Sequence, residues 1–208
     1  MLTGSTGHLG KALLAQLLPL GVSLVLIIRN KIKFKTDIVL ASYLKIYPTQ
    51  IKLVMLDSIY QNNINAQNRF KSNSDIENLF SGLNFVIHAA TEYGISSSKD
   101  DVLKINLELP LFLLKFTRKF SSAKFINIDT YYSLFQSYEY LPSYGLTKRF
   151  LSDWGMLESN EHDVSSNIFY NLRLFHCYGE VFQSGRFISN LIRDALWGVD
   201  MEITSGKQ

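Results

Sequence analysis

Apolar segments alternate along this chain with segments of helical periodicity. Continuous apolar runs predict strands buried on both faces, and they occupy residues 22–28, 51–56, 84–90, 123–129 and 167–175. Helical patterns occupy residues 9–17, 75–80, 101–120 and 143–159. Residues 60–74, rich in Asn and Gln, are expected to form a mobile surface connection. This order of elements is typical of an α/β fold with a doubly wound parallel sheet.

The chain opens on a glycine-rich loop, MLTGSTGHLG, in which Gly4, Gly7 and Gly10 recur at every third position. Glycines let the backbone approach an anion, and the N–H groups at the start of the following helix point toward it. The loop predicts the pyrophosphate site of a Rossmann-type sheet, although an ordinary strand–helix turn has the same pattern. A nucleoside-triphosphate P-loop is not expected, because no Gly-Lys-Ser/Thr sequence ends the loop. Only Met1 and Leu2 precede it, so we expect the first strand to be mostly missing.

Two residues that follow predicted strands bear on the choice of cofactor. Arg29 comes after the strand at 22–28, where NAD-binding enzymes tend to carry a carboxylate that accepts hydrogen bonds from the ribose. A guanidinium pairs instead with a 2′-phosphate, so Arg29 favours NADP(H) over NAD(H), unless it is merely a solvated residue. Asp57 ends the next strand and either accepts a hydrogen bond from the adenine amino group or forms a turn.

The strongest candidate for chemistry is PSYGLTKRF, in which Tyr144 and Lys148 are four residues apart. On a helix this spacing puts both side chains on one face. An adjacent ammonium favours the phenolate, so the pair can exchange a proton with an alcohol or carbonyl oxygen during hydride transfer. Thr130 adds a hydroxyl at the carboxyl end of the preceding strand.

Composition excludes several classes of protein. The 208 residues are 47% hydrophobic and 19% charged with a net charge of +3, which indicates a globular chain and no nucleic-acid or membrane partner. Lys31, Lys33 and Lys35 alternate as on a solvated edge. The single cysteine, Cys177, excludes an internal disulfide, and with no signal peptide or membrane-length apolar run the chain is expected to be cytoplasmic. The four histidines lack ligand spacing, so no metal site is expected.

These pieces together resemble the extended short-chain dehydrogenase/reductase family, the NAD(P)-dependent epimerases, dehydratases and reductases of nucleotide sugars. The matching segments are TGSTGHLG, Asp57, VIHAA, Asn106 in KINLELP, FINIDT, YGLTK and LRLFHCYG, and they follow the family's order over nearly the whole chain. The resemblance implies a Rossmann domain at residues 1–178 and the start of a substrate-binding lobe at 179–208. It also implies that the chain is truncated at both ends.

The resemblance carries roles onto individual residues. Thr130, Tyr144 and Lys148 match the Ser/Thr–Tyr–Lys triad, and Asn106 matches the family's structural asparagine. Tyr144 is then the acid–base residue, Lys148 lowers its pKa and binds the nicotinamide ribose, and Thr130 bonds the reacting oxygen. The implied cofactor-binding residues are Thr3, Gly4, Thr6, Gly7, His8, Leu9, Gly10, Arg29, Asp57, Ser58, His88, Ala89, Ala90 and Lys148. The implied substrate-binding residues are Thr130, Tyr131, Tyr144 and His176.

Departures from the family pattern narrow the activity. The 4,6-dehydratases carry Asp-Glu after the triad Thr, whereas Tyr131 and Tyr132 follow here. The segments NIDT and PSYGLTKRFLSDW most resemble those of nucleotide-sugar 4-ketoreductases of the CDP-abequose synthase type, which act in O-antigen pathways. We therefore expect NADPH-dependent reduction of a 4-keto-6-deoxy sugar nucleotide. The alternatives are a 4-epimerase that retains NAD and a non-catalytic dinucleotide sensor.

Three further features keep two interpretations each. His88 is expected to be a core or cofactor-neighbouring residue more than a base. His176 either contacts the substrate diphosphate or caps the last strand. The aromatic residues near Tyr131 either pack over a sugar or anchor their loop, with anchoring slightly favoured. Relatives often dimerise through the helices that correspond to 101–120 and 143–159, which makes a homodimer an expectation by analogy.

Overall fold

The fold is described from a computed structural model, which describes residues 1–59, 74–120, 123–135, 139–160, 168–178, 187–200 and 205. Six strands form one sheet in the order β3-β2-β1-β4-β5-β6. The strands are β1 (Leu2–Thr3), β2 (Leu24–Ile28), β3 (Ile51–Met55), β4 (Phe85–His88), β5 (Lys124–Thr130) and β6 (Phe169–Leu174). The doubly wound α/β fold is confirmed. The predicted connection at 60–74 lies almost wholly outside the described residues.

Strand β1 is short but central in the sheet. Leu2 is paired in parallel with Leu26 of β2 on one side and with Ile87 of β4 on the other. Leu2 is fully buried, and Thr3 is 1% exposed. Two residues thus suffice to bring the glycine loop to the carboxyl edge of the sheet.

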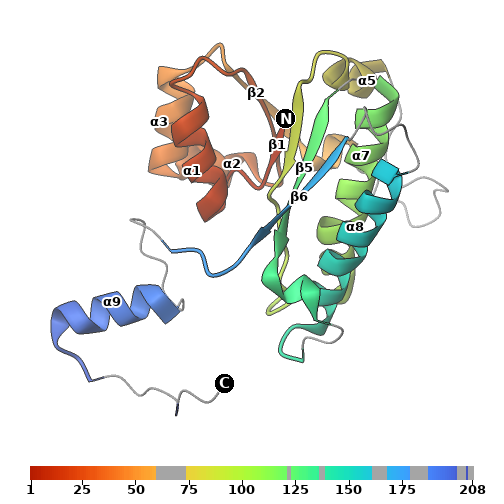
Figure 1. Ribbon diagram of the computed structural model, residues 1–208. Coiled ribbons are helices and arrows are strands. Elements are labelled where there is room, and N and C mark those ends of the chain that lie inside the picture. The colour runs from red at the N-terminus through yellow and green to blue at the C-terminus, as the bar shows by residue number, and fades with distance from the viewer. Residues whose placement is uncertain are drawn as a thin grey trace. The chain divides into compact units, whose positions relative to one another are not determined.

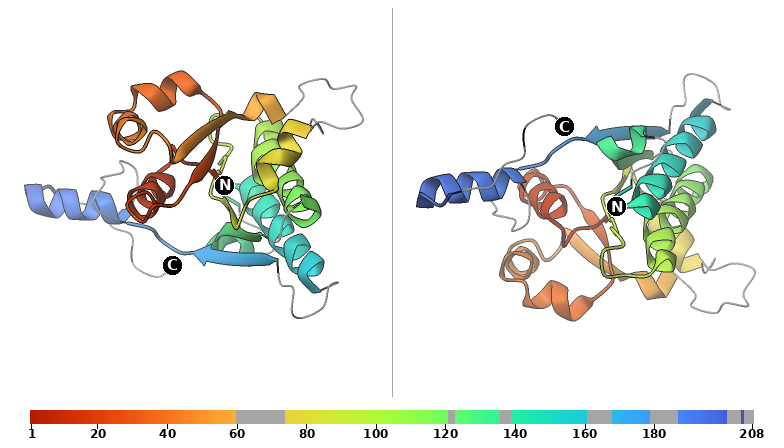
Figure 2. Two further views of the ribbon diagram at one scale, coloured as in Figure 1. Left: turned by 90° about the horizontal axis from the view of Figure 1, so that it is seen from above. Right: turned by 90° about the horizontal axis from the view of Figure 1, so that it is seen from below.

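Helices cover both faces of this sheet, as Figures 1 and 2 show. Helices α1 (His8–Leu17), α2 (Lys31–Thr36) and α3 (Ile38–Ile46) lie on one face, and α5 (Ser74–Phe80), α7 (Leu109–Phe120) and α8 (Pro142–Asn160) on the other. One core contains Leu2, Leu14, Leu18, Leu24, Leu26, Phe34 and Leu40. The second contains Phe80, Val86, Phe112, Leu113, Phe116, Phe125 and Phe169. The two apolar faces explain why the strands are continuous apolar runs.

The helix predicted at 101–120 is interrupted. It consists of α6 (Lys99–Leu103), a π-helical segment η1 (Lys104–Glu108) and α7. Pro110 stands at the second position of α7 and has no N–H to donate to the preceding turn. The wider π turn accommodates this break, and such bulges often occur at functional sites.

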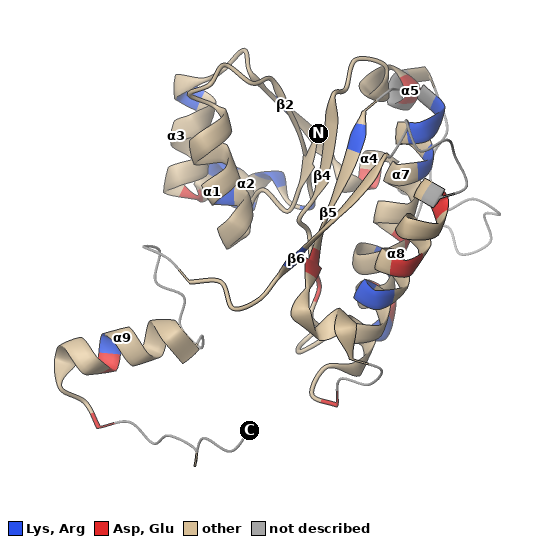
Figure 3. Ribbon diagram, viewed as in Figure 1, with Lys and Arg blue, Asp and Glu red and all other residues tan. Residues whose placement is uncertain are grey.

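The lysines at 31, 33 and 35 are exposed, which agrees with the predicted solvated edge. They belong to α2, whose N-terminus is capped by the Asn30 side chain, and Phe34 anchors this short helix in the core. Asp37 then caps α3 by accepting from the N–H of Leu40 at 3.2 Å. Figure 3 shows basic residues on α2 and charges of both signs along α8.

The chain divides into two compact units, Met1–Arg173 and Leu174–Gln208. The second contains helix α9 (Phe187–Trp197) and the exposed Cys177. The expected domain boundary at residue 178 stays a prediction. Among the described residues, none of the helices combines the length and the apolar character that a membrane crossing requires.

Candidate active site

The glycine loop is held against the end of β4 by contacts that leave no room for side chains. Gly4 has a φ of +74°, and a Cβ there would lie 2.5 Å from the backbone carbon of Ala89. A Cβ on Gly10 would lie 2.1 Å from the carbonyl oxygen of Gly4. Gly7 is the N-cap of α1 and meets nothing closer than 3.3 Å. Close packing therefore explains why residues 4 and 10 are glycines, and it fixes the loop at the start of α1.

The start of α1 fits an anionic group. No side chain caps it, and its first turn, which begins with His8 and Leu9, contains no acidic residue. The N–H groups of this turn and the positive end of the helix dipole are therefore available to an anion. The hydroxyl of Ser5 in the loop is buried without a hydrogen-bond partner. These features suit the pyrophosphate of a dinucleotide, while Thr6 is exposed beside them.

His88 lies at the end of β4, fully buried and adjacent to the loop. Its Nδ1 is 2.9 Å from the hydroxyl oxygen of Thr3, which also accepts from the N–H of Ala90 at 3.2 Å. Burial, together with the positive charge of Lys148, lowers the pKa of His88 well below 6.5. The imidazole is therefore neutral at physiological pH, and its Nε2 is without a partner. The interpretation as a core or cofactor-neighbouring residue fits this geometry better than that of a base.

Arg29 follows β2 and pairs across the edge of the sheet with Glu92, with 3.1 Å between Nη1 and Oε2. Its side chain is 63% exposed. Asp57 and Ser58 do not extend β3, because residues 56–59 form the short helix α4 (Leu56–Ile59). The Ser58 hydroxyl donates to the carbonyl of Met55 at 2.6 Å. The adenine contact of Asp57 stays a prediction.

Tyr144 and Lys148 lie one turn apart on α8, and both are buried, with 6% and 1% exposure. The Lys148 Nζ donates to the carbonyl oxygen of Ile128 on β5 at 2.9 Å. Burial lowers the pKa of Lys148 from 10.5 to about 8, and the negative charge of Asp129 opposes this shift. The ring of Tyr144 contacts that of Tyr93, with 5.0 Å between centroids. The lysine ammonium is thus fixed beside the sheet edge on the same helix as the phenol.

Thr130 ends β5 and is 8% exposed. Its Oγ1 accepts from the N–H of Tyr132 at 3.4 Å and caps the short helix η2 (Tyr131–Leu134), which leaves the hydroxyl proton able to reach another acceptor. The ring of Tyr131 packs edge-on against Tyr132 and Phe135. These ring contacts favour the anchoring interpretation of the aromatic residues. The sugar contact of Tyr131 stays a prediction.

Asn106 lies in the π-helical segment and is completely buried. Its Oδ1 accepts from the N–H of Glu92, and its Nδ2 donates to the carbonyl of Glu92, both at 2.8 Å. Nδ2 is also 3.3 Å from the hydroxyl of Thr147 on α8. One side chain therefore ties the loop after β4 to the helix that carries Tyr144 and Lys148.

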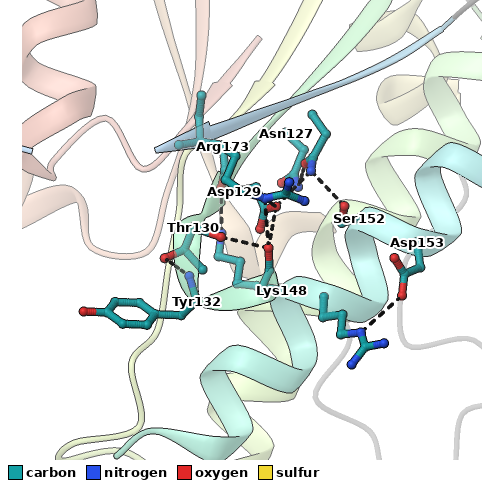
Figure 4. Close-up of polar contacts among 12 residues, drawn as sticks. Asn127, Asp129, Thr130, Tyr132, Lys148, Ser152, Asp153 and Arg173 are labelled. Carbon is teal, nitrogen blue, oxygen red and sulfur yellow. Dashed lines mark hydrogen bonds and ion pairs between the residues drawn. The ribbon is translucent and has the colours of Figure 1, made fainter. Parts of the chain in front are cut away.

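A polar network around the buried Asp129 was not found from the sequence (Figure 4). Asp129 on β5 accepts from Ser133 at 2.7 Å, from Asn171 at 2.9 Å and from the Nε of Arg173 at 3.0 Å. Asn171 also donates to Ser152 of α8 at 2.8 Å. The only signal for this network in the sequence is that polar residues interrupt two otherwise apolar strands.

The structure brings most of the expected residues to one edge of the first unit. The glycine loop, Arg29 and His88 lie at or directly after the ends of β1, β2 and β4. Thr130 ends β5, and Lys148 of α8 packs against the carboxyl end of that strand. His176 is exposed in the second unit, and its substrate role stays a prediction. Among the described residues, no group of His, Cys, Asp and Glu side chains has a metal-binding arrangement.

Comparison with known proteins identifies the family. The NAD dependent epimerase/dehydratase family matches residues 1–208. CDP-abequose synthase of Salmonella typhimurium is 31% identical over 202 residues, covering 92% of this chain and 57% of that protein. CDP-abequose synthase of Salmonella muenchen is 26% identical over 211 residues, covering 100% of this chain and 63% of that protein. The chain thus spans about three fifths of these curated relatives.

Solved structures agree on the fold. UDP-glucuronic acid 4-epimerase of Bacillus cereus, in complex with NAD, superposes with a TM-score of 0.65 at 20% identity, covering 95% of this chain and 62% of that one. A short-chain dehydrogenase/reductase of Burkholderia vietnamiensis superposes with a TM-score of 0.63 at 16% identity, covering 94% and 89%. The match over the full length, with the glycine loop and the buried Tyr–Lys pair in place, shows that the chain belongs to the NAD dependent epimerase/dehydratase family.

Proposed function

We propose that this chain is the catalytic part of an NADP(H)-dependent oxidoreductase that reduces a 4-keto-6-deoxy sugar nucleotide in surface-polysaccharide synthesis. The observation that carries the proposal is the buried Lys148, bonded to Ile128 one helical turn from the buried Tyr144. A sensor would gain nothing from burying an ammonium beside a phenol, because such burial is costly. The names of the two Salmonella relatives support this substrate class. A reducing compartment, as the single cysteine indicates, is part of the proposal.

NADPH, when bound, supplies the hydride that reduces C4 of the sugar. The residues of this chain handle the proton. Tyr144 donates its phenolic proton to the carbonyl oxygen, and the Lys148 ammonium stabilises the phenolate that remains. With a pKa of about 8, Lys148 is mostly protonated at pH 7. The Thr130 hydroxyl, whose oxygen already accepts from Tyr132, donates to the same substrate oxygen.

A 4-epimerase is the second candidate, and one observation favours it. The carboxylate of Glu92 lies next to Arg29, where it is able to accept a hydrogen bond from a ribose hydroxyl of NAD. An epimerase interconverts two sugar nucleotides and consumes no NADPH. The two activities are therefore distinguished by whether turnover oxidises the dinucleotide.

The test follows the near-ultraviolet absorbance of NADPH when the purified chain is mixed with CDP-4-keto-6-deoxyglucose. We expect NADPH to be consumed, and Tyr144→Phe to lower kcat by about a hundredfold or more, which is typical of losing a general acid. Tyr170→Phe removes a hydroxyl from the half-exposed β6 position and should leave kcat unchanged. A second mixture contains NAD and a sugar nucleotide that carries a C4 hydroxyl; its conversion into the C4 epimer, with no NADPH oxidised in the first mixture, would favour the epimerase. Dinucleotide binding with no turnover in either mixture would favour the sensor.

A further inference from the structure

The ion pair between Arg29 and Glu92 spans the region where a dinucleotide is expected to enter. Arg29 follows β2, Glu92 lies four residues beyond the end of β4, and β1 runs between those two strands. The 3.1 Å contact therefore crosses the carboxyl end of β1, where the glycine loop begins. Ligands of doubly wound sheets bind at this edge.

Glu92 is the fixed partner of the pair. Both of its backbone groups are bonded to the buried amide of Asn106 at 2.8 Å, and the adjacent Tyr93 packs on Tyr144. Its side chain is 20% exposed, against 63% for Arg29. Arg29 is consequently the partner that can turn toward a ligand, while the carboxylate keeps its place.

We propose that Glu92 is a cofactor-specificity residue that opposes the 2′-phosphate of NADPH, both by holding Arg29 and through its own negative charge. This inference rests on the proposed dinucleotide site. Asp101, in the first turn of α6, adds a second negative charge within electrostatic reach of Arg29. Arg29 without Glu92 would give a strong preference for NADPH over NADH, whereas the Arg29–Glu92 ion pair gives a weak one.

The two cofactors make different demands on this pair. A phosphate monoester carries about 1.5 to 2 negative charges at neutral pH, so it competes with Glu92 for Arg29 and is repelled by the carboxylate. NADH leaves the ion pair intact, and its ribose hydroxyl can donate to Glu92. The neutral Glu92→Gln side chain removes the competition and the repulsion. The clamp by Asn106 acts on the backbone of residue 92, so it survives this substitution.

The experiment titrates the purified chain with NADPH and with NADH and follows the fluorescence of Trp154 and Trp197. Glu92→Gln should lower the Kd of NADPH by about three- to fivefold at low salt and leave that of NADH within about twofold, since exposed pairs contribute up to about 1 kcal/mol. Arg29→Gln should raise the Kd of NADPH by about tenfold, as expected for a lost phosphate contact. Glu77→Gln, on α5, makes the same change in net charge and should alter the Kd of neither dinucleotide.

The double variant separates this inference from the proposed function. In the Arg29→Gln background, Glu92→Gln should lose at least half of its effect, and high salt should also reduce that effect because exposed charges are screened. If Arg29→Gln weakens NADPH but Glu92→Gln leaves its Kd unchanged, the role of Glu92 is overturned and the proposed function stands. If neither variant changes the binding of NADPH, or if neither dinucleotide binds, the NADPH assignment falls as well.

Discussion

Replacing Asp129 by Asn would test whether the polar network around this residue supports the fold. The Asp129 side chain is completely buried and accepts three hydrogen bonds, from Ser133, Asn171 and Arg173, at 2.7–3.0 Å (Figure 4). Asp129→Asn keeps the shape and an acceptor oxygen but removes the charge. Its new amide nitrogen would occupy a position where the Asp129 Oδ1 has no partner.

The expected cost is about 2–3 kcal/mol of unfolding free energy. Hydrogen bonds to charged groups contribute about 1 kcal/mol more than neutral ones, and three such bonds are weakened. The Arg173 side chain is 33% exposed, so water recovers part of the loss. A loss of this size is a large fraction of a typical stability of about 5–15 kcal/mol and corresponds to a fall in Tm of roughly 4–12 °C.

Urea unfolding followed by tryptophan fluorescence and circular dichroism measures this cost. Asp153→Asn is the matched control, because Asp153 is 71% exposed and pairs with Arg149 only at 3.6 Å on the surface of α8. The control should lose less than about 0.5 kcal/mol. Equal small losses in the two variants would refute the argument, because the buried network would then contribute no more than a surface pair.

Two further substitutions probe the site. Lys148→Met should abolish turnover and yet raise the unfolding free energy at pH 7 by about 1–3 kcal/mol, since burying the ammonium is costly. The native lysine releases its proton near pH 8 and the unfolded one near 10.5, so wild-type stability rises over this window and the difference should vanish in urea titrations at pH 10.5. Gly10→Ala places a Cβ 2.1 Å from the Gly4 carbonyl and should weaken dinucleotide binding by at least about tenfold in fluorescence titration, whereas Gly82→Ala, with open space around it, should not.

The sheet could be predicted because burial on two faces leaves a continuous apolar signal in the sequence. The run at 51–56 became β3 at Ile51–Met55, and the helix at 143–159 became α8 at Pro142–Asn160. The short helix α2 was not predicted. Its six residues bury one side chain, Phe34, and so leave no helical periodicity in the sequence.

The site could be predicted where its geometry is local in the sequence and not where it depends on distant partners. Tyr144 and Lys148 are close because four residues make one helical turn. Arg29 and Glu92 are 63 residues apart, and Asp129 and Arg173 are 44 apart. Neither pair could be predicted from spacing in a single sequence, because only the order of the strands in the sheet brings the two residues together.

Buried polar atoms without hydrogen-bond partners also point to the carboxyl edge of the sheet as the place where a ligand binds. Among the described residues, six buried side-chain atoms have no partner, and two of them, Ser97 Oγ and Asn190 Oδ1, lie outside the sheet. The other four, Ser5 Oγ, His88 Nε2, Asn127 Oδ1 and Asp129 Oδ1, lie in or just after β1, β4 and β5. Leaving such atoms unsatisfied costs about 1–3 kcal/mol each. A fold bears this cost where a bound polar molecule or water satisfies such atoms, and the buried ammonium of Lys148, which donates to Ile128, lies at the same edge.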